Sequence, residues 1–279
     1  MMSATASTIV TATATMGAIG AFFAVLLVAL AKRTSSAADE KVELLTSLLP
    51  GNNCGGCGMA GCAAMAEALA KGEAVPQACP VASESQIMRI AEALGLNEPI
   101  HRDRRVARVR CGGHKAISLW RADYEGVLDC RAADLVGKGS KGCVFGCLGL
   151  GTCARTCPYG AITMSESGLP VVNEAICTGC GLCEAACPRG VIKVLDASQE
   201  VFVRCVSTLP GKQVRSVCEV GCIGCGICVR VCPEGAIEML GHLACVDPDR
   251  CTKCGLCVEK CPTDAMQHLL EGAGVVTVA

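Results

Sequence analysis

Aromatic residues are scarce in this chain of 279 residues, which has one Trp, two Tyr and four Phe. With so little material for a large conventional core, we expect another interaction to hold the fold together. The sequence also lacks a G-x-G-x-x-G fingerprint, a P-loop, a C-x-x-C-H haem motif and an H-E-x-x-H motif. We therefore expect no flavin or nucleotide site and no catalytic residue on this chain.

The chain also lacks an excess of charge of either sign, since its formal net charge is −1. The most basic stretch, residues 101–110 (HRDRRVARVR), is interpreted as a solvated connector, with a docking patch as the alternative. We expect no nucleic acid partner. The four histidines, His101, His114, His242 and His268, are scattered and are interpreted as surface or structural residues.

One segment lacks charge altogether and is not typical of a globular domain. Residues 8–31 contain no charged side chain, and Lys32 and Arg33 follow directly. About 20 apolar residues suffice to span a bilayer as a helix, and basic residues favour the cytoplasmic side. We therefore expect a short tail (1–7), then a single-pass anchor (8–31) in the inner, cytoplasmic membrane. The N-terminus would lie outside, and the remaining domains would be cytoplasmic.

Cysteine is abundant, with 25 residues. Disulfides are rare in a reducing cytoplasm, and an odd number cannot pair completely. Metal ligation is therefore the leading explanation, and the spacing of the cysteines has to decide between zinc and iron–sulfur clusters.

The chain after the anchor divides into four segments. Residues 38–96 contain a helical pattern at 38–50, a glycine-rich cysteine loop at 51–62, a helical run directly after it and a further helix from Ser83 to Gly95. They predict a small helical module. Residues 97–141 form a connecting region with a possible strand at 106–111. The rest is an internal repeat, 142–200 and 201–279, in which each copy has two cysteine loops, each followed by a helix, joined by a hairpin.

Three loops of the repeat have regular C-x2-C-x2-C-x3-C-P spacing, which is typical of bacterial [4Fe–4S] ferredoxins. In such pairs the last cysteine of one loop ligates the other cluster. Structural zinc fits poorly, because its sites usually have two separated C-x2-C pairs. The predicted ligand sets are Cys157, Cys177, Cys180 and Cys183; Cys222, Cys225, Cys228 and Cys261; and Cys232, Cys251, Cys254 and Cys257.

The fourth loop of the repeat, GCVFGCLGLGTCARTCP (142–158), is irregular, because Leu150 replaces its middle cysteine. Cys143 is the nearest substitute. The predicted ligands of this site are Cys143, Cys147, Cys153 and Cys187. Cys218 occupies the position equivalent to Cys143 in the second copy, where it is a spare or an alternative to Cys225.

The helical module has its own set of four cysteines. Cys54, Cys57, Cys62 and Cys79 predict one separate [4Fe–4S] cluster, with zinc as a serious alternative. This gives about five clusters. Cys205 and Cys245 lie in strand-like segments and are interpreted as buried apolar residues. For Cys111 and Cys130 the sequence leaves two roles open, as cluster ligands or as residues packed near a cluster.

The predicted fold is therefore an α+β multi-module chain: a transmembrane helix, a small helical 4Fe-4S module and two tandem bacterial-type 2[4Fe-4S] ferredoxin-like βαβ repeats. An N-terminal membrane helix, LPGNNCGGCGMAGC…CP and GCLGLGTCARTCP together resemble the B subunit of the Rnf complex. The resemblance implies an iron–sulfur subunit of a membrane ferredoxin:NAD⁺ oxidoreductase that translocates Na⁺ or H⁺. It also implies that soluble ferredoxin and other Rnf subunits are partners. The alternatives are a polyferredoxin of another membrane oxidoreductase, linked to hydrogenase or quinone, and a zinc-stabilised scaffold.

Overall fold

The structure is a computed structural model that describes residues 2–34, 37–96 and 103–269. Within α1 and at the start of α2, the side chains of residues 2–12, 30–34 and 37–38 are not described. The chain divides into two compact units. The first comprises 1–53, 59–76 and 85–99, and the second comprises 54–58, 77–84 and 100–279.

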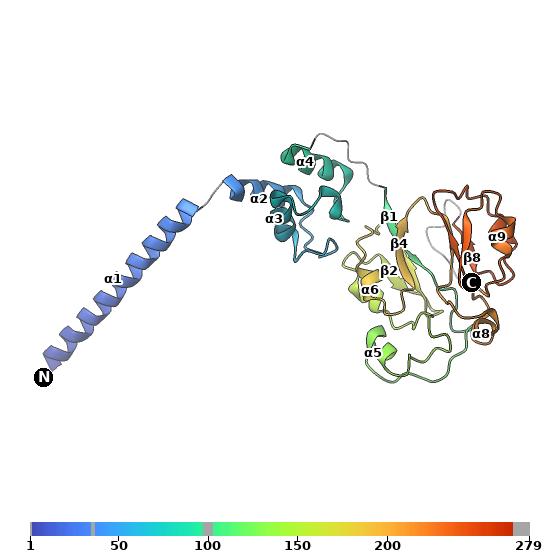
Figure 1. The fold of residues 1–279 in the computed structure, drawn as a ribbon. Helices are drawn as coiled ribbons and strands as arrows, with labels where there is room; N and C mark the ends of the chain where they lie inside the picture. Colours follow the sequence, from blue (N-terminus) through green and yellow to red (C-terminus); the bar gives the residue numbers. More distant parts are fainter. Residues whose placement is uncertain (1, 35–36, 97–102, 270–279) are drawn as a thin grey trace. The chain divides into compact units, whose positions relative to one another are not determined.

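Helices make up the first unit (Figure 1). They are α1 (Met2–Thr34), α2 (Ala37–Leu48), α3 (Cys62–Lys71) and α4 (Glu84–Leu94). Leu45 of α2 and Met65 and Leu69 of α3 are almost completely buried, which matches the apolar face expected from their spacing. Helix α3 ends at Gly72, whose positive φ of 73° permits the turn that closes the helix. The predicted helices of the 38–96 module are confirmed.

The predicted membrane anchor, residues 8–31, lies within α1. Both ends of this run fall outside the residues whose side chains are described. In the part of the chain that the structure describes, no helix is both long and apolar enough to cross a membrane. The single-pass anchor is therefore not supported by the structure and stays a prediction.

Two ferredoxin-like modules make up most of the second unit. The first module contains β1 (Arg105–Val109), α6 (Thr152–Thr156), β2 (Ile162–Met164), β3 (Pro170–Val172), α7 (Leu182–Ala186) and β4 (Ile192–Asp196). The second contains β5 (Val201–Val203), α9 (Ile227–Val231), β6 (Ile237–Leu240), β7 (Leu243–Val246), α10 (Leu256–Glu259) and β8 (Met266–His268). A 3-10 turn (Pro76–Ala78) and the short helices α5 (Cys130–Leu135) and α8 (Gly211–Arg215) complete the described elements.

The strand pairing is the same in both modules. The outer strands pair antiparallel, β1 with β4 and β5 with β8, and the inner strands form the hairpins β2–β3 and β6–β7. Both predicted hairpins are confirmed. The order of elements in each module is βαβ–βαβ, as predicted. Every described strand pair is antiparallel, and each pair joins a strand of the first βαβ unit to a strand of the second. The predicted connecting region supplies β1, so the first module begins before residue 142.

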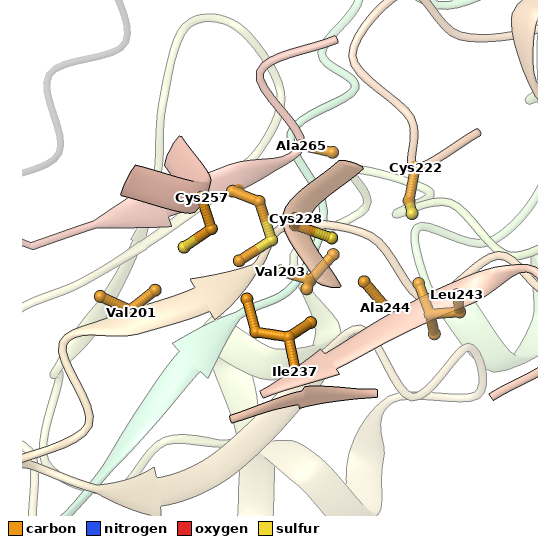
Figure 2. Packing of buried hydrophobic residues seen from close by; sticks show 10 residues of the cluster. Val201, Val203, Cys222, Cys228, Ile237, Leu243, Ala244, Cys257 and Ala265 are labelled. Atoms are coloured by element: carbon orange, nitrogen blue, oxygen red, sulfur yellow. The ribbon is translucent and has the colours of Figure 1, made fainter. Parts of the chain in front are cut away.

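Each module has a core in which cysteines pack among aliphatic side chains. In the second module, Val201, Ile237 and Ala244 pack with Cys222 and Cys228 (Figure 2). The first module has the equivalent mixture, with Val191 and Ile192 packed against Cys147, Cys153 and Cys183. No large aromatic side chain fills the middle of either cluster. The cores are therefore built around the thiols, as the shortage of aromatic residues suggested.

Candidate iron–sulfur sites

The backbone of the cysteine loops is set by glycines in the left-handed region. In the regular loop that begins at Cys222, Gly224 has φ 67° and Gly226 has φ 66°, and Gly226 directly precedes helix α9. The irregular loop has the same shape, because Gly149 has φ 73° and Gly151 has φ 72° before helix α6. Residues with a Cβ adopt this conformation only at a cost. The glycines on either side of Leu150 thus have the same left-handed φ as those on either side of Cys225.

A cavity in the second module is lined by one of the predicted ligand sets. Four cysteines line it: Cys222, Cys225, Cys228 and Cys261. The space among its lining atoms is about 350 Å³, with its open side included. The structure thus brings these four residues together, three from one loop and the fourth from the other, as expected for crossed ligation.

The other two regular sets stay predictions, and the packing brings together only part of each. Cys157 and Cys177 pack against the core cluster that contains Cys183, and Cys251 packs against the core cluster that contains Cys257. Burial raises the pKa of Cys183 to about 12, and the neighbouring thiols of Cys180 and Cys177 contribute to this shift. Burial likewise raises the pKa of Cys180, with a contribution from Cys157. In the second module, burial raises the pKa of Cys257 to about 11, and the thiols of Cys251 and Cys254 contribute to this effect. Cys232 packs against the same core.

The irregular loop gathers a different set from the predicted one. A cavity of about 370 Å³, open side included, is lined by the thiols of Cys130, Cys147, Cys153 and Cys187. Burial raises the pKa of Cys153 to about 11, and Cys130 and Cys187 are the thiols that contribute most to this shift. Cys143, the predicted fourth ligand, does not line this cavity. It lines another one, together with Cys111, Cys205 and Cys218.

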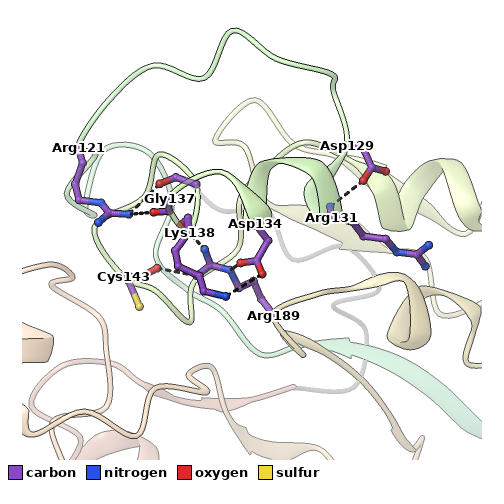
Figure 3. A network of polar contacts seen from close by, with 9 residues as sticks. Arg121, Asp129, Arg131, Asp134, Gly137, Lys138, Cys143 and Arg189 are labelled. Atoms are coloured by element: carbon purple, nitrogen blue, oxygen red, sulfur yellow. Dashed lines mark hydrogen bonds and ion pairs between the residues drawn. The ribbon is translucent and has the colours of Figure 1, made fainter.

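Cys130 reaches the irregular loop because a polar network fixes helix α5. The Asp129 carboxylate caps the helix by accepting hydrogen bonds from the backbone N–H groups of Arg131 and Ala132 (Figure 3). The Thr152 hydroxyl accepts a hydrogen bond of 2.7 Å from the Cys130 N–H and donates one of 3.1 Å to Asp129. Since Thr152 is next to Cys153, one hydroxyl holds Cys130 beside a cysteine of the loop.

A buried arginine holds the far end of the same network. Arg189 Nε lies 2.5 Å from Asp134 Oδ1, in the geometry of an ion pair rather than a well-aligned hydrogen bond. Arg189 also donates to the carbonyl oxygens of Lys138 and Cys143, so α5 and the segment leading to the irregular loop are tied together (Figure 3). Arg189 follows Cys187-Pro188 directly. The network therefore connects the chain segments that carry Cys130, Cys143 and Cys187.

The predicted set of the helical module is divided between the two units. Cys54, Cys57 and Cys79 belong to segments of the second unit, and Cys62 belongs to the first. Within the first unit, the Asn53 side chain accepts a hydrogen bond of 2.8 Å from the Cys62 N–H at the start of α3. This ligand set stays a prediction.

Burial opposes the loss of the proton from the Cys147 thiol. Burial raises the pKa of Cys147 to about 12, so its neutral form is favoured at neutral pH. A metal site needs thiolates, and cluster binding must therefore displace this proton. Among the residues that the structure describes, no group of three or more His, Cys, Asp or Glu side chains is arranged to hold a single metal ion.

Comparison with protein families supports iron–sulfur binding over the same segments. Residues 49–81 match the model of a putative Fe-S cluster domain. Residues 142–191 and 221–265 match a 4Fe-4S dicluster domain, and residues 176–237 match a second dicluster model. The chain therefore contains 4Fe-4S domains.

Similar proteins cover most of the chain. It is 43% identical to the B subunit of an ion-translocating oxidoreductase complex of Methanosarcina acetivorans, over 88% of this chain and 93% of that protein. The chain belongs to the family of Rnf complex B subunits. It is also 42% identical to the corresponding subunit of a proton-translocating ferredoxin:NAD(+) oxidoreductase complex of Clostridium ljungdahlii, over 88% of this chain and 86% of that protein. The B subunit of the Na(+)-translocating ferredoxin:NAD(+) oxidoreductase complex of Acetobacterium woodii is 40% identical, over 85% of this chain and 71% of that protein.

Proposed function

We propose that this chain is the iron–sulfur electron-transfer subunit of an ion-translocating ferredoxin:NAD⁺ oxidoreductase. It would take electrons from reduced soluble ferredoxin and deliver them to other Rnf-type subunits, which reduce NAD⁺ and translocate Na⁺ or H⁺. Family membership and the names of the similar proteins support this proposal. The chain itself would carry no active site for NAD⁺ and would act as part of an oxidoreductase.

The observation that carries the proposal is the series of cysteine-lined sites within the second unit. Cys153 of the irregular loop is buried in the same core cluster as Cys183, so the two sites of the first module are neighbours. Cys228 and Cys257 share the core cluster of the second module in the same way. A [4Fe–4S] cluster supplies one-electron oxidation and reduction when bound. Neighbouring sites of this kind suit electron transfer rather than bond chemistry.

We propose five ligand sets, one of them altered from the sequence prediction. In the irregular site Cys130 takes the place of Cys143, because it lines the cavity with Cys147, Cys153 and Cys187. Leu148, Met164 and Ile192 are among its lining residues, and such apolar neighbours would help to keep water from a bound cluster. The three regular sets and the set of the helical module are kept as predicted: Cys157, Cys177, Cys180 and Cys183; Cys222, Cys225, Cys228 and Cys261; Cys232, Cys251, Cys254 and Cys257; and Cys54, Cys57, Cys62 and Cys79.

The membrane location is part of the proposal and has its own test. We propose that residues 8–31 anchor the chain in the inner membrane, with the N-terminus outside and the cysteine-rich modules in the cytoplasm. Cell fractionation of the full chain and of a variant lacking residues 2–33 would test the anchor. The full chain should stay in the membrane after a wash at high salt, and the shortened chain should not. Equal membrane retention of both forms would refute the anchor.

The decisive experiment for the function is anaerobic purification of the full chain from membranes with its partners. The preparation should reduce NAD⁺ when reduced ferredoxin is supplied, and removal of this subunit should abolish that activity. Co-purification with a hydrogenase or a quinone-linked complex instead would favour the alternative polyferredoxin function. Zinc in place of iron and acid-labile sulfide would favour the scaffold.

A further inference from the structure

Four of the cysteines left outside the five proposed sites meet in one cavity. Cys111, Cys143, Cys205 and Cys218 line it, together with apolar groups such as Phe145 and Val214. Cys111 and Cys143 are buried, and Cys205 and Cys218 are half-buried. The space among the lining atoms is about 360 Å³ with its open side included, between the values of the two cluster cavities described above. A site of the same size and the same number of thiols is thus present outside the regular loops.

The four cysteines occupy the same two positions in each module. Cys111 follows strand β1 in the sequence VRC, and Cys205 follows strand β5 in the same sequence VRC. Cys143 precedes the first cysteine of its loop, Cys147, by the same spacing as Cys218 precedes Cys222. Both modules therefore contribute an equivalent pair of thiols to one shared site.

Two basic side chains, Lys141 and Arg204, line this cavity. Lys141 is 1% exposed, and its Nζ donates to the carbonyl oxygens of Gly113 and Cys147 and lies 4.0 Å from Cys111 Sγ. Both carbonyl groups are uncharged, and a buried charge is unfavourable unless it is paired. Four thiolates around a cluster would supply negative charge.

The cavity is lined by residues of both modules. The Cys147 N–H of the irregular site donates a hydrogen bond of 3.4 Å to Cys111 Sγ. On the other side, Cys205 packs against the core cluster of the second module, which contains Cys222. The cavity thus has a proposed cluster ligand of the first module on one side and one of the second module on the other.

We propose that Cys111, Cys143, Cys205 and Cys218 bind a further [4Fe–4S] cluster, the sixth of this chain, shared by the two ferredoxin-like modules. It would connect the site of Cys130, Cys147, Cys153 and Cys187 with the site of Cys222, Cys225, Cys228 and Cys261. Each transfer would move one electron from a reduced cluster to an oxidised neighbour, with no bond formed or broken. Only this role rests on the proposed electron-transfer function; the binding site does not.

Iron and sulfide content of the full chain, purified anaerobically, tests the site without any assay of activity. Six clusters give about 24 iron and as many sulfides per chain, whereas five give about 20. Cys111→Ala, Cys143→Ala, Cys205→Ala and Cys218→Ala should each lose about four iron. The matched control is Cys245→Ala, because Cys245 lies in β7 and lines none of the proposed cluster sites, and it should lose none.

Double variants separate the shared site from its neighbour. Cys143→Ala with Cys218→Ala should lose no more than either alone, because both residues belong to one cluster. Cys130→Ala with Cys143→Ala should lose about eight iron, because they belong to two. The clusters that remain also show that the variant has folded.

Three results would overturn the proposal. The first is about 20 iron in the parent chain with no loss in the Cys218→Ala variant. The second is one zinc ion per chain that disappears with Cys143. The third is a loss of only about four iron in the Cys130 and Cys143 double variant, which would place both residues in a single cluster. None of these results depends on whether ferredoxin is the electron donor.

Discussion

Replacement of Lys141 by methionine should lower the reduction potential of the nearest cluster. The side chain is buried between the proposed shared site and the irregular site, 4.0 Å from Cys111 Sγ and 3.2 Å from the Cys147 carbonyl oxygen. Methionine keeps most of the volume and removes the positive charge. An added electron loses the attraction of that charge, so the reduced state becomes less stable.

The magnitude follows from Coulomb's law. At an effective dielectric constant of about 20 and a distance of about 7 Å from Nζ to the middle of a cluster, the interaction is about 2.4 kcal/mol. For a one-electron couple, about 1.4 kcal/mol corresponds to about 59 mV. The Lys141→Met variant should therefore show one cluster whose potential is about 100 mV lower, and a neighbour with a smaller shift.

A redox titration of the full chain, followed by electron paramagnetic resonance, measures this shift. Lys138→Met is the matched control, because Lys138 is mostly exposed and its charge is screened by water and salt. The iron content should be unchanged in both variants. The reasoning would be refuted if Lys141→Met kept all its iron and every potential stayed within the shift seen for Lys138→Met.

The remaining predictions concern stability and site geometry. Asp134→Ala leaves the buried charge of Arg189 without its partner, and should cost about 3 kcal/mol and lower the melting temperature, whereas Asp134→Asn should cost less. Gly113→Ala places a Cβ 2.9 Å from Cys218 Sγ, so it should displace that thiol and lose as much iron as Cys218→Ala; a full iron content would contradict this. Anaerobic chelation of the iron should unfold residues 142–262, since metal binding contributes to folding in small modules. Circular dichroism before and after chelation measures this effect, and an unchanged spectrum would count against it.

Local patterns in the sequence predicted the local structure well. Apolar spacing located α2, the helical run after the cysteine loop located α3, and the capping signals at Ser83 and Gly95 located α4. Apolar segments around a short turn located both hairpins. The regular cysteine loops were recognised because their ligands are close together in the sequence. The pairing of β1 with β4 was not predicted, because it joins residues that are far apart in the chain.

The same limit explains the irregular site. Cys143 is close to Cys147 in the sequence, so spacing favoured it as the substitute for Leu150. Cys130 lies farther upstream, and only the Asp129 cap and the Thr152 hydroxyl bring it to the loop. A search among the unassigned cysteines could have proposed Cys130, but no local pattern separates it from Cys111.

The equivalent VRC positions after β1 and β5 have a consequence for the isolated halves of the chain. A single ferredoxin-like module has only two of the four thiols of the shared site, so it cannot bind that cluster as a monomer. The proposed site is complete only when both modules contribute their pair of thiols. Each half alone should therefore behave as an ordinary two-cluster ferredoxin, and a complete shared cluster should report that the two halves are correctly joined.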